Sequence, residues 1–273
     1  MKLIFTDLDG SLLDHHSYSF SPAAALLKEL ERQHIPVIPV TSKTCAEVLS
    51  LRDTLANTHP FIVENGAAIY LRKEYFPLAP QDCTKIGNYW CIRNSQPRSH
   101  WQALLAKEGG PFADEYQTFD SICANQGLEG LAALTGLSIH QATLAQQREF
   151  SEPIQWLGTQ ERKNQFIAQL TEAGATLLQG GRFLTLGGNT DKGRALLQLK
   201  ALYHQQLGVC QSLAIGDSGN DVSMLEIADS ALIIKSQNHP APRLQRTDNL
   251  YMSTATGPQG WAEGVTAWLT NNP

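Results

Sequence analysis

Four short polar clusters hold the residue types that could do chemistry in this chain, and the first contains two aspartates. Asp7 and Asp9 stand one residue apart after an apolar run and directly before Gly10. The glycine permits a turn that brings both carboxylates toward one point. Two close carboxylates repel each other, so a bound cation is the natural way to keep both ionised. The pair therefore predicts a cation site, although the same spacing also suits an ordinary turn from a strand into a loop.

A second cluster, residues 216–221, offers further oxygen ligands. Asp217 and Asp221 add carboxylates, and Asn220 adds a side-chain amide. A ligand set made of oxygens, without His or Cys, suits Mg²⁺, which keeps several waters and also binds substrate phosphate. We therefore expect a magnesium site formed by Asp7, Asp9, Asp217 and Asp221.

The remaining two clusters supply positive charge and hydroxyl groups. Lys192 begins a helical pattern, where a cation is normally disfavoured, so we expect an anion beside it. Together with the N-terminal amides of that helix, its ammonium group can neutralise the oxygens of a phosphoryl group. The hydroxyl of Thr41 or Ser42 would hold another phosphoryl oxygen. The alternatives are a solvated lysine and a pair of N-cap residues for the next helix.

Apolar runs that alternate with helical patterns surround these clusters. Strands are predicted at residues 2–6, 35–40, 61–63, 213–215 and 231–234, and helices at residues 45–56, 192–207, 222–228 and 260–269. This alternation predicts a doubly wound sheet of parallel strands. Ligands bind beyond the carboxyl ends of the strands in such sheets, and the four clusters lie at strand ends or helix starts.

The middle of the chain differs in composition, being richer in Gln and aromatic residues and mixing short strands with helices such as residues 160–173. We interpret residues 82–187 as an inserted α/β domain. Residues 1–81 and 188–273 would then form the catalytic core.

In this order the four clusters resemble the four motifs of the haloacid dehalogenase superfamily, and the resemblance covers essentially the whole chain. An insertion between the second and third motifs is the mark of the superfamily's C2 class, and residues 64–67 (Glu-Asn-Gly-Ala) resemble its Cof-like branch. The resemblance implies a Rossmann-like doubly wound parallel sheet with an inserted C2-type cap domain.

The resemblance also implies a role for each motif residue in a Mg²⁺-dependent phosphatase. Asp7 would attack phosphorus, and Asp9 would protonate the leaving alcohol and then activate water. Mg²⁺ would be held by Asp7, the backbone carbonyl of Asp9 and Asp217, with Asp221 as a ligand or a supporting residue. The implied catalytic residues also include Thr41, Ser42, Lys192 and Asn220.

Two cap segments resemble signatures of the mannosyl-3-phosphoglycerate phosphatase family: residues 147–153 and residues 180–183. A substrate with both a phosphate and a carboxylate favours Arg, which binds planar anions through two hydrogen bonds. The predicted substrate-binding residues are Lys43, Asn65, Arg148, Glu149, Phe150, Glu152 and Arg182. Surface salt bridges and ordinary cap packing remain the alternatives for the cap residues. Gly219 stands where members of that family often have Pro, which weakens the case for this substrate.

Composition limits the partners. A net charge of -5 and a pI near 5.9 argue against a nucleic-acid surface. We expect no membrane span, because no stretch has the roughly 18 apolar residues needed. Five scattered cysteines without a CxxC pattern suit reduced thiols in the cytoplasm. The expected partner is a phosphorylated small molecule, and the sequence does not indicate an oligomeric state.

Three other functions fit parts of these patterns. A phosphosugar mutase of the phosphomannomutase type shares the motifs but must return its phosphoryl group to a sugar rather than to water. A broad-specificity sugar phosphatase would use the same core with a less selective cap. A non-catalytic sugar-phosphate sensor is disfavoured, because all four clusters keep their reactive side chains.

Overall fold

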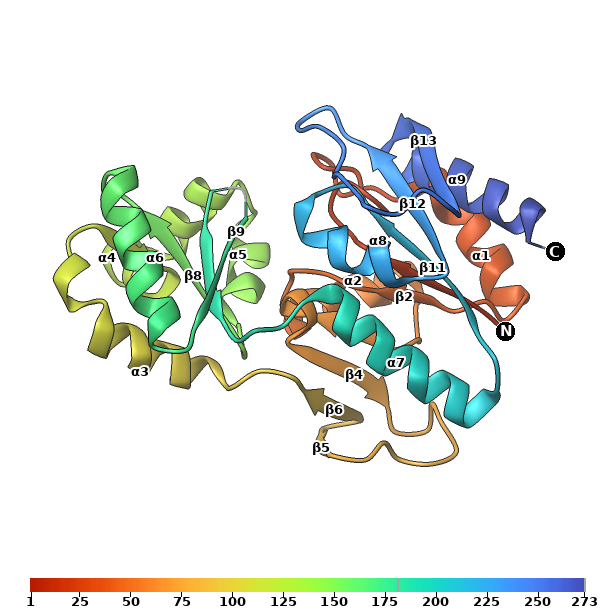
Figure 1. The fold of residues 1–273 in the computed structure, drawn as a ribbon, viewed down its shortest axis with the longest axis horizontal. Helices are drawn as coiled ribbons and strands as arrows, with labels where there is room; N and C mark the ends of the chain where they lie inside the picture. Colours follow the sequence, from red (N-terminus) through yellow and green to blue (C-terminus); the bar gives the residue numbers. More distant parts are fainter. Residues whose placement is uncertain (181, 273) are drawn as a thin grey trace. The chain divides into compact units, whose positions relative to one another are not determined.

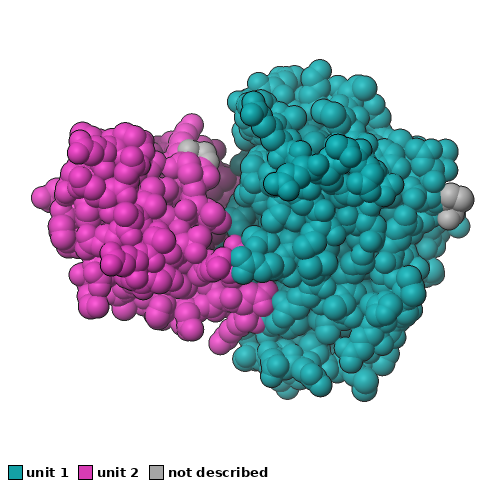
Figure 2. Space-filling model, in the orientation of Figure 1, with its two compact units in different colours: residues 1–42, 57–92, 191–273 teal, residues 43–56, 93–190 magenta. Residues whose placement is uncertain are grey.

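A computed structural model describes residues 1–180 and 182–272, so Gly181 of the second cap segment lies outside the described residues. The chain divides into two compact units (Figures 1 and 2). Unit 1 comprises Met1–Ser42, Asn57–Ile92 and Asp191–Pro273, and unit 2 comprises Lys43–Ala56 and Arg93–Thr190. The boundaries that the sequence suggests for an inserted domain, residues 82–187, stay a prediction.

Unit 1 is built on a parallel five-stranded sheet in the order β13-β12-β11-β1-β2. Its strands are β1 (Lys2–Thr6), β2 (Val37–Pro39), β11 (Gln211–Gly216), β12 (Ser230–Lys235) and β13 (Leu250–Thr256). The chain starts at β1, inside the sheet, moves outward to the edge strand β2, and later continues on the other side of β1 with β11. This is the doubly wound arrangement expected from the sequence, and the predicted α/β fold with a parallel central sheet is confirmed.

Helices cover both faces of this sheet, because its strands are apolar on both sides (Figure 1). Neighbouring residues of β12 illustrate the alternation: Leu232 packs against Gly264 of α9, whereas Ile233 belongs to the core cluster with Met224 of α8. The helices of unit 1 are α1 (Ala24–Arg32), α7 (Lys192–Leu207), α8 (Val222–Ile227) and α9 (Gly257–Asn271).

The third predicted strand behaves differently from the expectation. β3 (Phe61–Val63) meets the central sheet through a single parallel bridge between Val40 and Ile62. It instead forms an antiparallel pair with β4 (Ala68–Arg72) in a second sheet of order β3-β4-β6-β5. The remaining strands of this sheet are β5 (Cys83–Ile86) and β6 (Tyr89–Arg93). β3 pairs with β4 because the tight turn at residues 64–66 returns the chain directly beside β3.

Unit 2 contains an antiparallel sheet of order β7-β8-β10-β9 with helices packed against it. Its strands are β7 (Tyr116–Thr118), β8 (Glu152–Trp156), β9 (Thr176–Gln179) and β10 (Leu184–Gly187). Its helices are α2 (Cys45–Leu55), α3 (Arg98–Glu108), α4 (Phe119–Thr135), α5 (Ile139–Gln146) and α6 (Gln160–Glu172). Trp101 of α3 and Phe166 of α6 form one apolar cluster with Ile154 of β8.

The start of α2 shows how local sequence sets an element boundary. The Thr44 hydroxyl accepts from the backbone N–H of Glu47, and the Glu47 carboxylate accepts from the backbone N–H of Thr44. This reciprocal capping satisfies two amides that the helix itself leaves unpaired. None of the helices among residues 1–180 and 182–272 is long and apolar enough to cross a membrane.

Candidate active site

The candidate site lies where the order of the central sheet reverses. β1 and β11 are neighbours in register, with Thr6 opposite Ile215, and each strand is followed directly by an aspartate. The backbone N–H of Asp7 extends the ladder by donating to the carbonyl of Ile215 at 2.8 Å. Because ligands of doubly wound sheets bind at such a switch point, Asp7 and Asp217 stand in the position that the fold favours for a site.

A tight turn after β1 keeps Asp217 close to the first motif. Gly10 adopts φ +79°, and its N–H donates to the carbonyl of Leu13 at 2.9 Å. A Cβ atom at this position would lie 2.5 Å from Oδ2 of Asp217. Glycine is therefore required both for the left-handed backbone and for the close approach of the carboxylate. Asp9 lies in the same turn and is half-buried.

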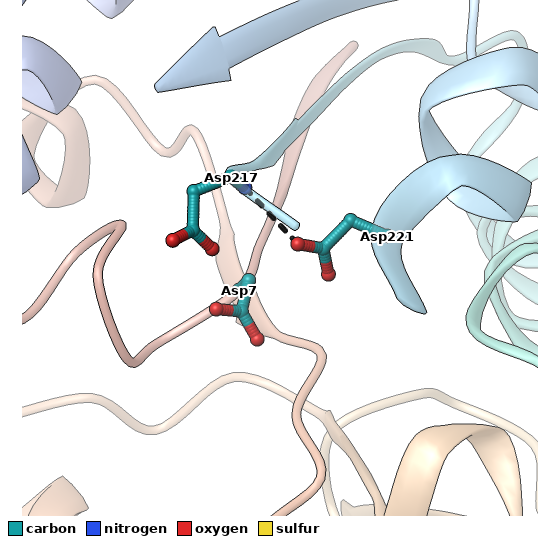
Figure 3. A group of neighbouring side chains, drawn as sticks. All are labelled: Asp7, Asp217 and Asp221. Atoms are coloured by element: carbon teal, nitrogen blue, oxygen red, sulfur yellow. Dashed lines mark hydrogen bonds between the residues drawn. The ribbon is translucent and has the colours of Figure 1, made fainter. Parts of the chain in front are cut away.

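Three buried carboxylates converge at this point (Figure 3). Each of Asp7, Asp217 and Asp221 offers an oxygen, and these oxygens lie within 4.8 Å of one another. Asp221 is also bonded within its own loop: Oδ2 accepts from the backbone N–H groups of Asp217 and Ser218, both at 3.0 Å. These bonds hold the loop after β11 in the shape that presents Asp217.

Lys192 provides the counter-charge. It is the first residue of α7, its side chain is 0% exposed, and its Nζ donates to Oδ1 of Asp7 and Oδ1 of Asp221, both at 2.6 Å. The sequence predicted an anion beside the cation at this helix start, and the structure places two carboxylates there. Asp191 caps the helix by accepting from the N–H of Arg194 at 2.8 Å.

The electrostatics of the cluster follow from burial and from crowding of like charges. Burial, together with repulsion from the neighbouring aspartates, raises the pKa of Asp7 well above its ordinary value despite the opposing effect of Lys192. Burial, and then repulsion from Asp221, raise the pKa of Asp217 to about 6. Burial acts to lower the pKa of Lys192, but Asp221 and Asp7 outweigh it and raise that pKa, so the ammonium stays charged.

These residues fit a divalent cation. Three clustered carboxylates against one ammonium leave a formal excess of two negative charges in a buried site. All the clustered donors are carboxylate oxygens, the ligand type that Mg²⁺ prefers. Both the charge balance and the chemistry of the donors therefore suit one hard divalent ion.

The loop at residues 64–66 joins the remaining motifs of unit 1. The N–H of Asn65 donates to the carbonyl of Thr41 at 2.9 Å, and the side-chain Oδ1 of Asn65 accepts from Nδ2 of Asn220 at 3.1 Å. Glu64, Asn65 and Gly66 all have positive φ, at 48°, 57° and 93°. Thr41 is buried, whereas Ser42 is exposed. The structure thus brings Thr41, Asn65 and Asn220 together.

The predicted cap residues lie in unit 2, where the structure pairs several of them with protein groups. Arg148 donates through Nε to the Ser151 hydroxyl at 3.0 Å, and Arg182 donates to the carbonyl of Leu134 at 2.5 Å. Phe150 is 2% exposed, and Glu149 accepts from the N–H of Arg98 through its backbone carbonyl. Lys43 lies 3.7 Å from Glu47 in the same unit.

Glu152 is the predicted substrate-binding residue whose side chain is most fully enclosed by protein groups in unit 2. Its carboxylate is 0% exposed and accepts from Arg98 at 2.7 Å and 3.0 Å and from Gln102 at 2.9 Å. The hydrogen bonds from Arg98 and Gln102 therefore give Glu152 a structural role in unit 2. Its predicted contact with a sugar hydroxyl stays a prediction. Arg98 was not singled out by the sequence, because a single Arg at a helix start carries no motif.

His239 is a second residue that sequence reasoning missed. Its Nε2 lies 3.2 Å from Oδ2 of Asp217, although it is 22 positions further along the chain. The sequence around His239 contains no motif that predicts this contact, and isolated histidines are common on protein surfaces.

The fold and the site define an α/β enzyme with an acidic centre at the switch point of a parallel sheet. The chain belongs to the haloacid dehalogenase-like hydrolase family, whose model matches residues 4–108 and 137–241. The resemblance predicted from the four motifs is confirmed. A glucosyl-3-phosphoglycerate/mannosyl-3-phosphoglycerate phosphatase of Methanococcoides burtonii is 33% identical over 271 residues, covering 99% of this chain and 98% of the relative. Family and relative together identify the chain as a phosphoric monoester hydrolase.

Solved structures share the fold at low sequence identity. A phosphatase of the haloalkanoate enzyme superfamily from Bacteroides thetaiotaomicron matches with a TM-score of 0.66 and 17% identity, covering 99% of this chain and 94% of that chain. The sucrose-phosphatase of Synechocystis sp. PCC6803, solved with sucrose and phosphate, matches with a TM-score of 0.56 and 15% identity, covering 97% of each chain. At these identities the similarity shows the fold alone.

Proposed function

We propose that this chain is a Mg²⁺-dependent phosphatase that forms an aspartyl-phosphate on Asp7 and acts on mannosyl-3-phosphoglycerate or a closely similar sugar phosphoglycerate. The observation that carries the reaction is the convergence of Asp7, Asp217, Asp221 and Lys192 at the switch point of the sheet. The substrate class is supported by the phosphoglycerate phosphatase that is 33% identical over nearly the whole chain.

In the proposed reaction the carboxylate of Asp7 attacks phosphorus as the bond to the substrate's alcohol oxygen breaks. Asp9 donates a proton to the leaving alcohol and then removes one from the water that hydrolyses the aspartyl-phosphate. Lys192 touches Asp7 and keeps its charge, so it orients the nucleophile and balances charge on the phosphoryl oxygens. Thr41, Ser42 and Asn220 are the proposed contacts for the remaining oxygens.

Asp7 and Asp217 are the proposed side-chain ligands of Mg²⁺, with the backbone carbonyl of Asp9. When bound, the ion supplies positive charge that stabilises the phosphoryl group during transfer. The hydrogen bonds of Asp221 favour the supporting role over direct ligation, because one of its oxygens accepts from Lys192 and the other from two backbone N–H groups. Replacing Asp221 would then disturb both Lys192 and the loop that carries Asp217.

The experiment that tests this function is a panel of phosphate esters assayed for phosphate release with and without Mg²⁺. The panel contains mannosyl- and glucosyl-3-phosphoglycerate, simple sugar phosphates and an aryl phosphate. We expect fastest release from a glycosyl phosphoglycerate, no release with chelator present, and no turnover by Asp7→Asn. Wild-type-like release by Asp7→Asn would refute the mechanism, and equal rates on all esters would refute the substrate class. Movement of the phosphoryl group from one sugar hydroxyl to another in the presence of a sugar bisphosphate activator, with no release of phosphate, would indicate a mutase.

We also propose a cytoplasmic location, which the five scattered cysteines without a CxxC pattern support. Fractionation of cells that express the protein tests this, and recovery outside the cytoplasmic fraction would contradict it.

A further inference from the structure

The loop between β12 and β13, residues 236–249, places His239 beside the cluster of Asp7, Asp217 and Asp221. Nε2 of His239 lies 3.2 Å from Oδ2 of Asp217, and its Nδ1 lies 3.3 Å from the carbonyl oxygen of Pro240. A neutral imidazole carries a single N–H, so the ring in that form can donate to only one of these two oxygens. The His239 side chain is 35% exposed, whereas that of Asp217 is 6% exposed, so the histidine stands at the rim of the cluster.

The far end of this loop is anchored to α8. Arg246 donates through Nη1 to the carbonyls of Leu225 at 2.7 Å and Ala228 at 2.8 Å, and through Nη2 to the carbonyl of Asp229 at 3.0 Å. The Glu226 carboxylate accepts from the backbone N–H groups of Gln245 and Arg246. These bonds satisfy carbonyls at the C-terminus of α8 and fix the loop to the helix that follows the Asp217 cluster.

We propose that His239 is a positioning residue for Asp217: its Nε2–H donates to Oδ2 and holds the carboxylate in the orientation that binds the divalent cation. The proposal rests on the Mg²⁺ site of the proposed function. Oδ2 of Asp217 is also the oxygen that packs against Gly10. The hydrogen bond from His239 and the close approach of the Gly10 backbone both restrict rotation of this carboxylate. An outer hydrogen-bond partner of a metal ligand typically contributes 10–100-fold to metal affinity.

The test compares His239→Ala with His239→Gln, whose Nε2 amide reaches the same place and donates a hydrogen bond without a ring. Mg²⁺ affinity is measured by calorimetric titration of protein freed of metal by chelator, and independently by the spectroscopic titration of Mn²⁺. We expect the Kd of His239→Ala to rise by about 10-fold or more and that of His239→Gln to stay within about 3-fold of the wild type. His140→Ala, at an exposed histidine of unit 2, is the matched control. Melting temperatures in chelator check that each variant is folded.

The outcomes separate this inference from the function on which it rests. Unchanged Mg²⁺ affinity in His239→Ala overturns the positioning role if Asp217→Asn loses binding in the same assay, and the proposed metal site then survives. Equal weakening in the Ala and Gln variants also overturns it, because the ring would then matter for something other than the donated hydrogen bond. Wild-type affinity in Asp217→Asn removes the metal site itself, and the inference with it.

Discussion

Lys192 donates through Nζ to Oδ1 of Asp221 at 2.6 Å, and both side chains are 0% exposed. The two residues stand 29 positions apart, one at the start of α7 and the other at the end of the loop after β11. The same ammonium reaches Asp7, which follows β1. One buried cation thus ties together three segments of unit 1 that carry three of the four sequence motifs.

Removing this cation should destabilise the protein most when no metal is present. Lys192→Met leaves the carboxylates of the cluster buried without their counter-charge, and breaking a buried pair costs about 3–5 kcal/mol. We expect a loss of that size in urea unfolding with chelator, and a larger recovery on adding Mg²⁺ than in the wild type. Lys107→Met, at an exposed lysine paired with Glu108, should change stability by less than about 1 kcal/mol. A metal-independent loss would contradict the charge argument.

Metal binding should weaken as the pH falls through the pKa of Asp217, which burial and Asp221 raise to about 6. The folded-state pKa lies above the unfolded value, so without metal the ionised group opposes folding above about pH 6, and this penalty diminishes as the pH falls. Bound Mg²⁺ requires the carboxylate, so the melting-temperature increase caused by Mg²⁺ should grow between about pH 5 and about pH 7. Asp217→Asn should show no increase in melting temperature with Mg²⁺ at any pH in this range. A Mg²⁺ effect of equal size across this pH range would contradict the prediction.

A side chain at Gly66 should displace the start of α7. A Cβ atom there would lie 2.2 Å from the carbonyl oxygen of Asp191, next to Lys192. We expect Gly66→Ala to lower kcat by at least about 10-fold, because small displacements of positioning groups cost up to about 100-fold in rate. Gly174→Ala is the matched control: φ is +96° there as well, compared with +93° at Gly66, but a Cβ would meet nothing within 4 Å. Steady-state kinetics with equal losses in both variants would mean that backbone strain, not the clash, is responsible.

The pair formed by Arg98 and Glu152 should stabilise unit 2. Burial raises the pKa of Glu152 while Arg98 opposes the shift, and Arg98→Met would leave this carboxylate buried without its partner. We expect a loss of about 3–5 kcal/mol in unfolding free energy, and a smaller loss in the double variant Arg98→Met/Glu152→Leu, which removes both charges. A double variant as unstable as Arg98→Met would show that packing of the Arg98 stem matters more than the charge pair.

Substrate choice should depend on Arg148 and Arg182. If they bind the carboxylate or phosphate of a glycosyl phosphoglycerate, Arg148→Ala and Arg182→Ala should raise KM for that substrate by about 10-fold or more while leaving KM for an aryl phosphate nearly unchanged. Equal changes for both substrates would show that these arginines do not recognise the glycerate or the sugar. Arg243→Ala, in the loop after β12 of unit 1, serves as the control.

Most of the fold follows from the sequence because local patterns determine it. The apolar run at residues 2–6 and the helical pattern at residues 192–207 coincide with β1 and α7. The helical pattern at residues 45–56 likewise matches α2 closely, but the N-cap is Thr44 and not Thr41 or Ser42, the alternative that the sequence offered. In contrast, the hairpin of β5 and β6 was not predicted, since its strands are partly exposed and lack a strong apolar alternation.

The sequence by itself determined the reaction class of this hydrolase, because the chemistry needs particular residue types at the ends of strands and the residues of each motif lie within a few positions of one another. Tertiary structure alone decided which of them meet and what each carboxylate is bonded to. It placed Lys192 between Asp7 and Asp221, paired Glu152 with Arg98, and brought His239 to Asp217. The physical reason is that such contacts depend on sheet order and on the path of loops, which join residues far apart in the chain and leave no local pattern.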